Sequence, residues 1–447
     1  MDFSGTSGKK GSILKHVLKP LAFTLLTVLL LLAAVAGQNR PGTSAARSGA
    51  DWPQFRGPDR NGISPQTGLI SAWPADGPKR LWTAAVGTGY SSVAVSRGKA
   101  YTTGNVNGTD TVFCLNALTG AGVWKYSCPA AATAWDSQAK SYPGTRATPT
   151  VDGTRVYTFS LDAQLHCLDA ESGKPIWKKD LLAEYKPRKT EYRWGFASSP
   201  VIVGRMLIQH LNAETLAFDK TTGKEIWHWQ DGEKEKDSGG YSTPVLFDSG
   251  GTPAVAVLTK SLVALTLDKG QELWRVNRWQ PYDHGLNAAD PIFLGNGVFL
   301  SQGNYTRSCG VFRFGGSGRP ATVWRNEADK GSMLVHFQSP VLKEGKLYGF
   351  SDGKLRCIDF ATGQVHWTEN VGTDKYGSLI LADGKLIVMT DRGELILVAA
   401  QPDKCTILAR AQVIGKPTWT APSLAGGLLY CRNTKGDVVC LDVRKSR

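Results

Sequence analysis

Residues 165–177 read L-H-C-L-D-A-E-S-G-K-P-I-W, and this stretch decides the fold of the chain. An alternating apolar run leads to Asp169, a polar turn contains Gly173, and a second apolar run ends in Trp177. This is the pattern of a β-hairpin. It returns in four further copies, the last of them looser: 217–227 (A-F-D-K-T-T-G-K-E-I-W), 357–367 (C-I-D-F-A-T-G-Q-V-H-W), 114–124 and 265–274. The sequence therefore predicts a repeat protein.

The number of repeats follows from the expected inner strands, which begin with a small residue and an apolar run. These starts lie at 91–93, 148–150, 199–201, 243–245, 290–292, 339–341, 377–379 and 421–423. The expected outer strands carry tryptophans spaced 42 to 53 residues apart, namely Trp82, Trp124, Trp177, Trp227, Trp274, Trp324 and Trp367. That period is typical of four-stranded propeller blades. We predict eight blades, or seven if the outer strand near Ile407, which has lost its tryptophan, belongs to an incomplete blade.

The two ends of the repeat region complement each other. The last repeat stops at 440–443 after its third strand, and residues 79–83 (K-R-L-W-T) supply a spare outer strand. Pairing the two would remove an open sheet edge, which is a hazard for aggregation. We therefore predict, over residues 51–447, an all-β, eight-bladed β-propeller of four-stranded antiparallel blades, with the ring closed by an N-terminal outer strand.

The first fifty residues have the character of a leader and a linker. Residues 1–20 are polar and basic, residues 21–36 are apolar, and the apolar run ends in A-V-A. The length and the small residues predict a leader helix over 1–36 that is a signal peptide, with an uncleaved membrane anchor as the alternative. Either places the rest of the chain in the periplasm or on the extracellular face of the cytoplasmic membrane. Residues 37–50, rich in Gly, Ser, Ala and Pro, are interpreted as a linker.

Composition and charge exclude little by themselves. The 447 residues are 41% hydrophobic and 20% charged, with 50 glycines and 14 tryptophans, which favours an all-β repeat fold. The formal net charge is +14, but the basic residues are dispersed with no run of five. We interpret them as solubility charge and expect no nucleic-acid partner for a monomeric propeller.

The eight cysteines divide into two groups of four. Cys114, Cys167, Cys357 and Cys440 occupy one equivalent repeat position, where a small buried hydrophobe is expected. The disulfide state of Cys128, Cys309, Cys405 and Cys431 is left open, although the register places Tyr430 rather than Cys431 opposite Cys440. No C-x-x-C occurs, so neither an attached c-type haem nor a thiol zinc site is supported.

The pattern D-x-x-T-G-x-x-x-W at 219–227 resembles the tryptophan-docking repeat of the pyrroloquinoline quinone (PQQ)-like propellers. Residues 51–62 (D-W-P-Q-F-R-G-P-D-R-N-G) and 146–153 (R-A-T-P-T-V-D-G) are similar to segments of exported bacterial proteins of that family. The family holds quinoprotein alcohol and glucose-type dehydrogenases, and also the non-catalytic propeller subunit of the outer-membrane β-barrel assembly machinery. The resemblance therefore implies the fold but not an activity. The chain lacks the adjacent cysteine pair of the methanol-type dehydrogenases.

Chemistry is expected at the mouth of the central channel, where the connections into the inner strands converge. A PQQ–calcium site needs oxygen ligands, an arginine and a planar stacking residue. The residues of those types at the mouth are Arg146, Trp194, Asn287, Asp290 and Trp419, with Asp290 the catalytic candidate if the chain is an enzyme. The same rim is alternatively a partner surface, for which the candidates are Trp135, Tyr142, Tyr192, Arg193, His284 and His336.

These observations favour an exported, non-catalytic scaffold that binds a protein or peptide partner of the cell envelope at one face, without a cofactor or a metal. The first alternative is a periplasmic dehydrogenase that uses PQQ and Ca²⁺ to oxidise an alcohol or a sugar. The second is a polysaccharide- or surface-binding module. In each case a membrane tether through residues 21–36 is an open possibility.

Overall fold

The computed structural model describes residues 51–129, 141–187, 194–232, 240–277, 279, 286–304, 307–315, 319–327 and 330–445. The chain divides into two compact units, Met1–Gly42 and Thr43–Arg447, and the described residues belong to the second. The expected leader at 1–36 and linker at 37–50 lie outside the described residues. Within the described part of the chain, no helix is long and apolar enough to cross a membrane.

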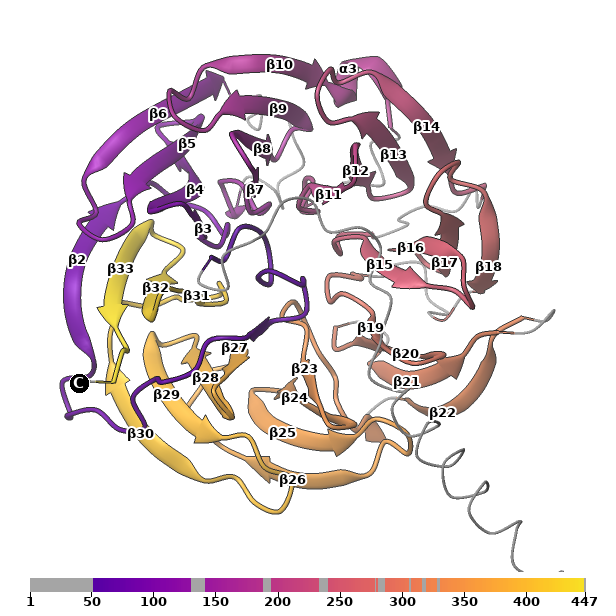
Figure 1. Cartoon of the computed structure of the whole chain (residues 1–447). Helices are drawn as coiled ribbons and strands as arrows, with labels where there is room; N and C mark the ends of the chain where they lie inside the picture. Colours follow the sequence, from indigo (N-terminus) through magenta and orange to yellow (C-terminus); the bar gives the residue numbers. More distant parts are fainter. Residues whose placement is uncertain are drawn as a thin grey trace, which may run out of the picture. The chain divides into compact units, whose positions relative to one another are not determined.

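The described strands form eight sheets that follow one another around a ring, which confirms the all-β, eight-bladed propeller (Figure 1). Blades 1 to 4 are, in chain order, β3 (Ala94–Ser96), β4 (Lys99–Val106), β5 (Thr109–Asn116) and β6 (Gly122–Pro129); β7 (Thr150–Asp152), β8 (Arg155–Phe159), β9 (Gln164–Asp169) and β10 (Pro175–Asp180); β11 (Val201–Val203), β12 (Met206–Leu211), β13 (Glu214–Asp219) and β14 (Glu225–Gln230); and β15 (Val245–Asp248), β16 (Pro253–Leu258), β17 (Leu262–Thr266) and β18 (Glu272–Val276). A short helix, α3 (Leu181–Tyr185), follows β10.

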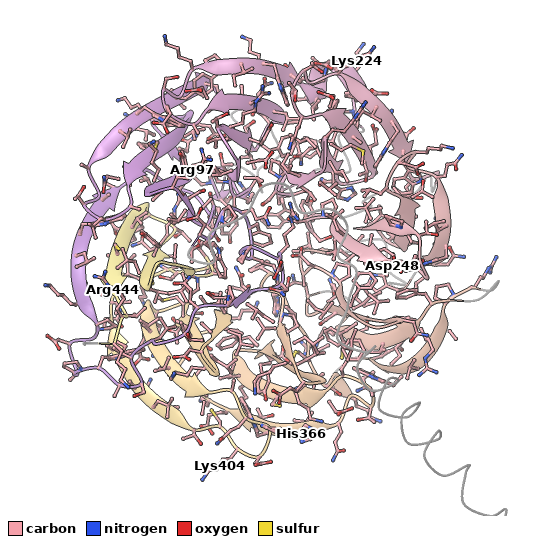
Figure 2. All side chains as sticks on the ribbon, in the orientation of Figure 1. Arg97, Lys224, Asp248, His366, Lys404 and Arg444 are labelled. Carbon is pink, nitrogen blue, oxygen red and sulfur yellow. The ribbon has the colours of Figure 1, made fainter. Side chains whose placement is uncertain are left out.

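Blades 5 to 8 continue the ring with the same antiparallel order. They are β19 (Ile292–Leu294), β20 (Gly297–Gln302), β21 (Ser308–Arg313) and β22 (Ala321–Glu327); β23 (Val341–Lys343), β24 (Lys346–Ser351), β25 (Lys354–Asp359) and β26 (Val365–Glu369); β27 (Gly377–Ala382), β28 (Lys385–Thr390), β29 (Glu394–Ala399) and β30 (Ile407–Gln412); and β31 (Ser423–Ala425), β32 (Leu428–Arg432) and β33 (Asp437–Asp442) with β2 (Lys79–Ala85). Side chains fill the ring, and the exposed Lys224, His366 and Lys404 lie at its outer edge (Figure 2).

The hairpin that decides the fold is built by its turn. Strands β9 and β10 pair antiparallel, and the Asp169 carboxylate accepts hydrogen bonds from the backbone N–H groups of Glu171 (3.1 Å) and Ser172 (2.8 Å). Gly173 has a φ of 71°, a conformation that glycine adopts at no steric cost. The residues of the turn therefore determine its conformation without contacts from elsewhere in the chain, as the sequence predicts.

The outer-strand tryptophan joins each blade to the next. The indole N–H of Trp177 donates to the backbone oxygen of Lys220 in blade 3, at 3.1 Å. Its ring lies against Gly223, where an added Cβ would stand 3.0 Å from the indole. The equivalent hydrogen bonds join Trp82 to Ala117, Trp124 to Ala170, Trp227 to Leu267, Trp324 to Phe360 and Trp367 to Gln401.

Two blade junctions depart from this rule. Trp274 donates instead to Ser249 of its own blade and stacks on Phe314 of blade 5, with ring centroids 4.9 Å apart. In blade 7, Ala409 lies opposite Leu397, in the register position that Trp367 occupies in blade 6. Sequence inspection noticed the missing tryptophan near Ile407, and the blade is nevertheless complete.

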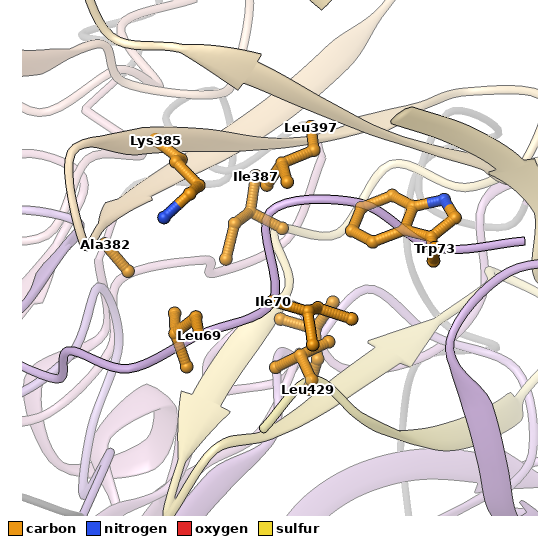
Figure 3. A pocket seen from close by; sticks show the side chains of 9 residues that line it. Leu69, Ile70, Trp73, Ala382, Lys385, Ile387, Leu397 and Leu429 are labelled. Atoms are coloured by element: carbon orange, nitrogen blue, oxygen red, sulfur yellow. The ribbon is translucent and has the colours of Figure 1, made fainter. Parts of the chain in front are cut away.

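The N-terminal segment fills the junction between blades 7 and 8. Its side chains Leu69, Ile70 and Trp73 lie between Leu397 of blade 7 and Leu429 of blade 8 (Figure 3). They belong to the hydrophobic cluster that also contains Ala409. An apolar segment from elsewhere in the chain thus supplies the packing that a tryptophan supplies at the other junctions.

The ring closes as the sequence predicts. Strand β2 pairs antiparallel with β33, with Thr83 opposite Val439 and Trp82 opposite Cys440. Tyr430 also lies opposite Cys440, and Cys431 does not. The eight cysteines all lie within the described residues and are free thiols. The four at the equivalent repeat position are fully buried, each between a tyrosine and a tryptophan of neighbouring strands.

Residues 51–66, which we call the plug, form a feature that the repeat pattern does not predict. In Figure 1 this indigo segment runs across the centre of the ring. Trp52 exchanges backbone hydrogen bonds with Val95 of blade 1, and β1 (Ile63–Ser64) pairs parallel with β27 of blade 7. The Gln66 side chain donates to the backbone oxygen of Leu424 in blade 8. The plug thus links blades that lie far apart in the sequence.

Replacing the tryptophan at one junction tests the docking arrangement. Trp227→Ala leaves a cavity against the next blade and removes the hydrogen bond to Leu267. We expect a loss of about 3–5 kcal/mol in the free energy of unfolding, measured by denaturant titration. Trp229→Ala, on the same strand but only partly buried, serves as the control and should cost clearly less. Equal losses from the two variants would contradict the docking role.

Removing the N-terminal strand tests ring closure. Deletion of residues 51–84 takes away the plug and all of β2 except Ala85, which exposes the edge of β33. We expect a lower melting temperature together with self-association on size-exclusion chromatography, because an unpaired strand edge invites pairing with another chain. A deletion variant that stays monomeric with an unchanged melting temperature would refute the closure.

Candidate functional site

The connections that lead from each outer strand to the next inner strand surround a cavity of about 340 Å³ at one end of the channel. Among the described residues, eight of the seventeen that line it are aromatic. The aromatic side chains come from the plug and from seven inter-blade connections, and they are Phe55, Tyr90, Tyr142, Trp194, Tyr241, Phe337, Tyr376 and Trp419. A small cavity with this lining has the character of a ligand pocket.

Trp419 lies in the middle of the aromatic group. Its ring stacks on Tyr90, with centroids 5.8 Å apart and planes 25° apart, and meets Tyr376 edge-on at 5.3 Å. Tyr142 and Phe337 lie 5.8 Å and 6.0 Å from it. Such pairs prefer offset or edge-to-face contacts, so the rings hold one another in place. The wall of the cavity is therefore formed before any ligand arrives.

Arg146 provides a cation in this wall. Its guanidinium donates to the backbone oxygens of Gly144 (2.6 Å) and Tyr142 (2.8 Å) and lies 5.2 Å from the centroid of the Tyr90 ring. Burial lowers the pKa of Arg146 to about 10, so the group stays protonated at neutral pH. Within the described part of the chain, no carboxylate oxygen forms an ion pair with it.

Asp290 lies at the floor of the cavity and is engaged by the protein itself. Its carboxylate accepts a hydrogen bond from the backbone N–H of Thr243 at 3.0 Å and stands 3.7 Å from Nε of Arg56 in the plug. Both side chains are only 6% exposed. Burial raises the pKa of Asp290 to about 6, with Arg56 opposing that rise. The aspartate thereby helps to fix the plug in the channel.

Arg56 is held mainly by hydrogen bonds to backbone carbonyl groups rather than by its ion pair with Asp290. Its guanidinium donates to the backbone oxygens of Ser339 (2.8 Å) and Pro340 (2.9 Å) at the start of β23, and to Asn61 (2.9 Å) within the plug. Burial lowers the pKa of Arg56, and the Asp290 charge opposes this. The arginine therefore joins the plug to blade 6 mainly through carbonyl groups.

The structure brings together four of the five residues that sequence analysis proposed for a cofactor: Arg146, Trp194, Asp290 and Trp419 line the cavity. Asn287 does not line it. Its side chain is fully buried and donates to the backbone oxygen of Thr259, while its backbone oxygen accepts from the N–H of Tyr241. Asn287 thus supports the connections behind the cavity wall.

Of the six residues proposed for partner contact, two lie at or beside the cavity and four lie outside the described residues. Tyr142 lines the cavity, and His336 lies beside it, with its ring 5.2 Å from that of Tyr376. Trp135, Tyr192, Arg193 and His284 lie outside the described residues. Sequence analysis missed Phe337, although its neighbour His336 had been proposed for partner contact, and it missed Phe55, which no repeat register marks.

A PQQ–calcium pair requires several oxygen ligands around the ion. Asp290 is the carboxylate of the described lining, and its oxygens already face Thr243 and Arg56. Among the described residues, no group of three or more His, Cys, Asp or Glu side chains is placed to hold a metal. The described lining therefore does not fit that cofactor, and we derive no chemical step from it.

Comparisons with known proteins agree with this fold. Residues 129–369 and 217–447 match the family described as outer membrane protein assembly factor BamB. A BamB of Burkholderia pseudomallei is 23% identical over 383 residues, which cover 83% of this chain and 90% of that protein. The crystal structure of BamB from Moraxella catarrhalis shares the fold with a TM-score of 0.57 and 14% identity, covering 83% of this chain and 98% of that one.

The same fold occurs in an enzyme. The quinohemoprotein alcohol dehydrogenase ADHIIG from Pseudomonas putida HK5 superposes with a TM-score of 0.64 and 14% identity, covering 90% of this chain and 81% of that chain. At such identity the likeness concerns the fold alone. The likeness to solved structures therefore does not distinguish a scaffold from a dehydrogenase.

The raised pKa of Asp290 predicts a pH dependence of stability. Its folded pKa of about 6 lies above the ordinary 3.8, so its stabilising contribution is fully present below about pH 4 and is lost as the pH rises through about 6. Relative to Asp290→Asn, which keeps an acceptor for Thr243, the wild type should gain about 2 kcal/mol between about pH 7 and pH 4.5. Denaturant titrations at both pH values measure this, and parallel pH curves for the two proteins would contradict it.

Proposed function

The chain belongs to the family described as outer membrane protein assembly factor BamB, and from that premise we propose an exported, non-catalytic scaffold that binds a protein or peptide partner of the cell envelope. The partner binds at the channel mouth. The observation that carries this proposal is the preformed aromatic cavity around Trp419. Tyrosine, tryptophan and arginine are the residue types that dominate binding energy at protein interfaces.

Three polar side chains of the described cavity wall are already engaged within the protein, which supports a scaffold over a sugar-binding module. The Gln338 amide donates to the backbone oxygen of Trp419 at 2.5 Å. The Ser199 hydroxyl accepts from the N–H of Thr148, and the Thr243 hydroxyl accepts from the N–H of Ser199. A sugar ring needs many hydrogen-bond partners for its hydroxyl groups, and leaving buried ones unpaired is costly. A polypeptide side chain that is mainly apolar meets this wall at lower cost.

We infer a location in the cell envelope, which the N-terminal sequence and the family support together. The leader proposed at 1–36, whether a cleaved signal peptide or an anchor, directs the propeller across the cytoplasmic membrane. The relatives that match most of the chain are named as outer membrane assembly factors. We place the partner in the same compartment as the propeller.

Site-specific photo-cross-linking in cells tests where the partner binds. A photoreactive phenylalanine analogue replaces Tyr376 at the cavity or, as the control, the exposed Thr368 on β26, the outer strand that precedes Tyr376 in the chain. We expect covalent polypeptide adducts from position 376 at several times the yield from position 368, because only the mouth contacts a partner. Equal yields, or none from position 376, would contradict a partner site at the mouth.

A titration separates the scaffold from the dehydrogenase alternative. We expect that purified protein mixed with PQQ and Ca²⁺ develops neither the absorbance of a bound quinone nor dye-coupled oxidation of alcohols or sugars. The described lining offers Asp290 alone as a carboxylate, which is already engaged. Appearance of both signals would overturn the non-catalytic assignment.

A further inference from the structure

The plug contributes to the inner side of the cavity, opposite the inter-blade connections. Phe55 of the plug forms part of that side, and the neighbouring Arg56 is bound to the carbonyl groups of Ser339 and Pro340. On the opposite side, the backbone oxygen of Pro53 accepts from the N–H of Val151. The plug therefore lies across the path of a polypeptide through the channel, and we infer that a ligand both arrives and leaves by the mouth.

The charge of the cavity is not balanced. Asp290 faces Arg56 at the floor, so their charges offset each other. Arg146 forms no ion pair among the described residues, and the carboxylate of Asp110 acts on it only at longer range. A guanidinium carries five N–H donors, and the two hydrogen bonds that Arg146 donates within the described residues go to backbone carbonyl groups of its own loop. Donors thus remain for an anion, and arginine binds a carboxylate in matching geometry.

Most of the rest of the wall favours an apolar body for that anion, although Asn304 in the described lining has a buried amide Nδ2 without a partner. The aromatic faces of Trp419, Tyr376 and Phe337 contact one another around the cavity, while Gln338, Ser199 and Thr243 already have partners in the protein. At about 340 Å³ the cavity is at the small end of ligand pockets. It therefore has room for one or two residues, and not for a helix or a hairpin.

We propose that this cavity captures the C-terminal residue of an extended polypeptide, with the terminal carboxylate at Arg146 and a large apolar side chain among the aromatic rings. A chain end fits this site because it needs only one opening, carries one carboxylate for the one cation, and is small enough for the volume. This inference rests on the proposed function and specifies the ligand of the same site. An internal acidic residue could reach Arg146 only if the chain entered the mouth and left it again, so that two strands of backbone would have to fit there.

Peptide binding to the purified full chain tests the proposal by isothermal titration calorimetry. The probes are ten-residue peptides with nine residues in common, ending in phenylalanine with a free carboxylate, in phenylalanine amide, or in alanine with a free carboxylate. A fourth peptide, amidated, carries Phe-Asp in its middle. We expect the free acid with phenylalanine to bind best and amidation to weaken binding about 10- to 100-fold, as for a lost hydrogen-bonded charge.

Variants connect the effect to Arg146. Arg146→Gln should lower the affinity for the free-acid peptide to that for the amide peptide, and should leave the affinity for the amide peptide unchanged. Arg392→Gln, which removes an exposed arginine paired with Asp374 on blade 7, should leave both peptides unaffected. Because the comparison of acid with amide uses the unaltered protein, it holds even if the Arg146 variant folds poorly.

Each contrary outcome has a definite meaning. Three results would overturn the chain-end inference. The free-acid and amide peptides could bind equally well, the internal Phe-Asp peptide could bind as well as the free-acid peptide, or no peptide could bind. The cross-linking experiment at position 376 tests the proposed function separately, because polypeptide adducts can form there in all three cases. Binding of a glucuronate oligosaccharide without binding of any peptide would overturn both.

Discussion

The contact between an outer-strand tryptophan and the turn of the next blade is the interaction on which the rest of this structure depends. The indole N–H binds a backbone carbonyl across the junction, and its ring lies on a glycine of positive φ. A four-stranded sheet cannot bury both faces alone, so each blade is stable only against its neighbours. Where the contact is altered, aromatic stacking at Trp274 or the segment around Trp73 takes its place. Packing at the junction, rather than the tryptophan itself, is what the fold requires.

The N-terminal segment connects this architecture to the site. Strand β2 completes blade 8 and removes the open edge of β33, while the plug crosses the centre of the ring and is bound to blade 6. The plug thereby lies across the path of a chain through the channel and leaves a cavity that receives an end. The buried pair of Arg56 and Asp290 lies at the floor of that cavity, where it serves the plug rather than a metal or a reacting group. Stability and ligand selection therefore depend on the same few residues.

The candidate site was only partly predictable, and the reason differs from residue to residue. Arg146 and Trp419 follow from their place before an inner strand, since every such connection must reach the mouth. Asn287 has an equivalent place, yet its amide turns away to Thr259, and side-chain direction is not encoded in the register. Phe55 lies outside the repeats altogether, and its position depends on how the plug crosses the ring.

The sequence by itself determined the hairpin unit, the count of eight blades, the closing strand and the equivalent burial of four cysteines. All of these depend on local turn chemistry and on a period repeated along the chain, which neighbouring residues suffice to express. Only the tertiary structure decided that residues 51–66 cross the centre of the ring, that Asp290 is paired with Arg56, and that residues from 55 to 419 form one aromatic cavity. Those features join segments hundreds of positions apart, and they come into contact only when the ring has closed.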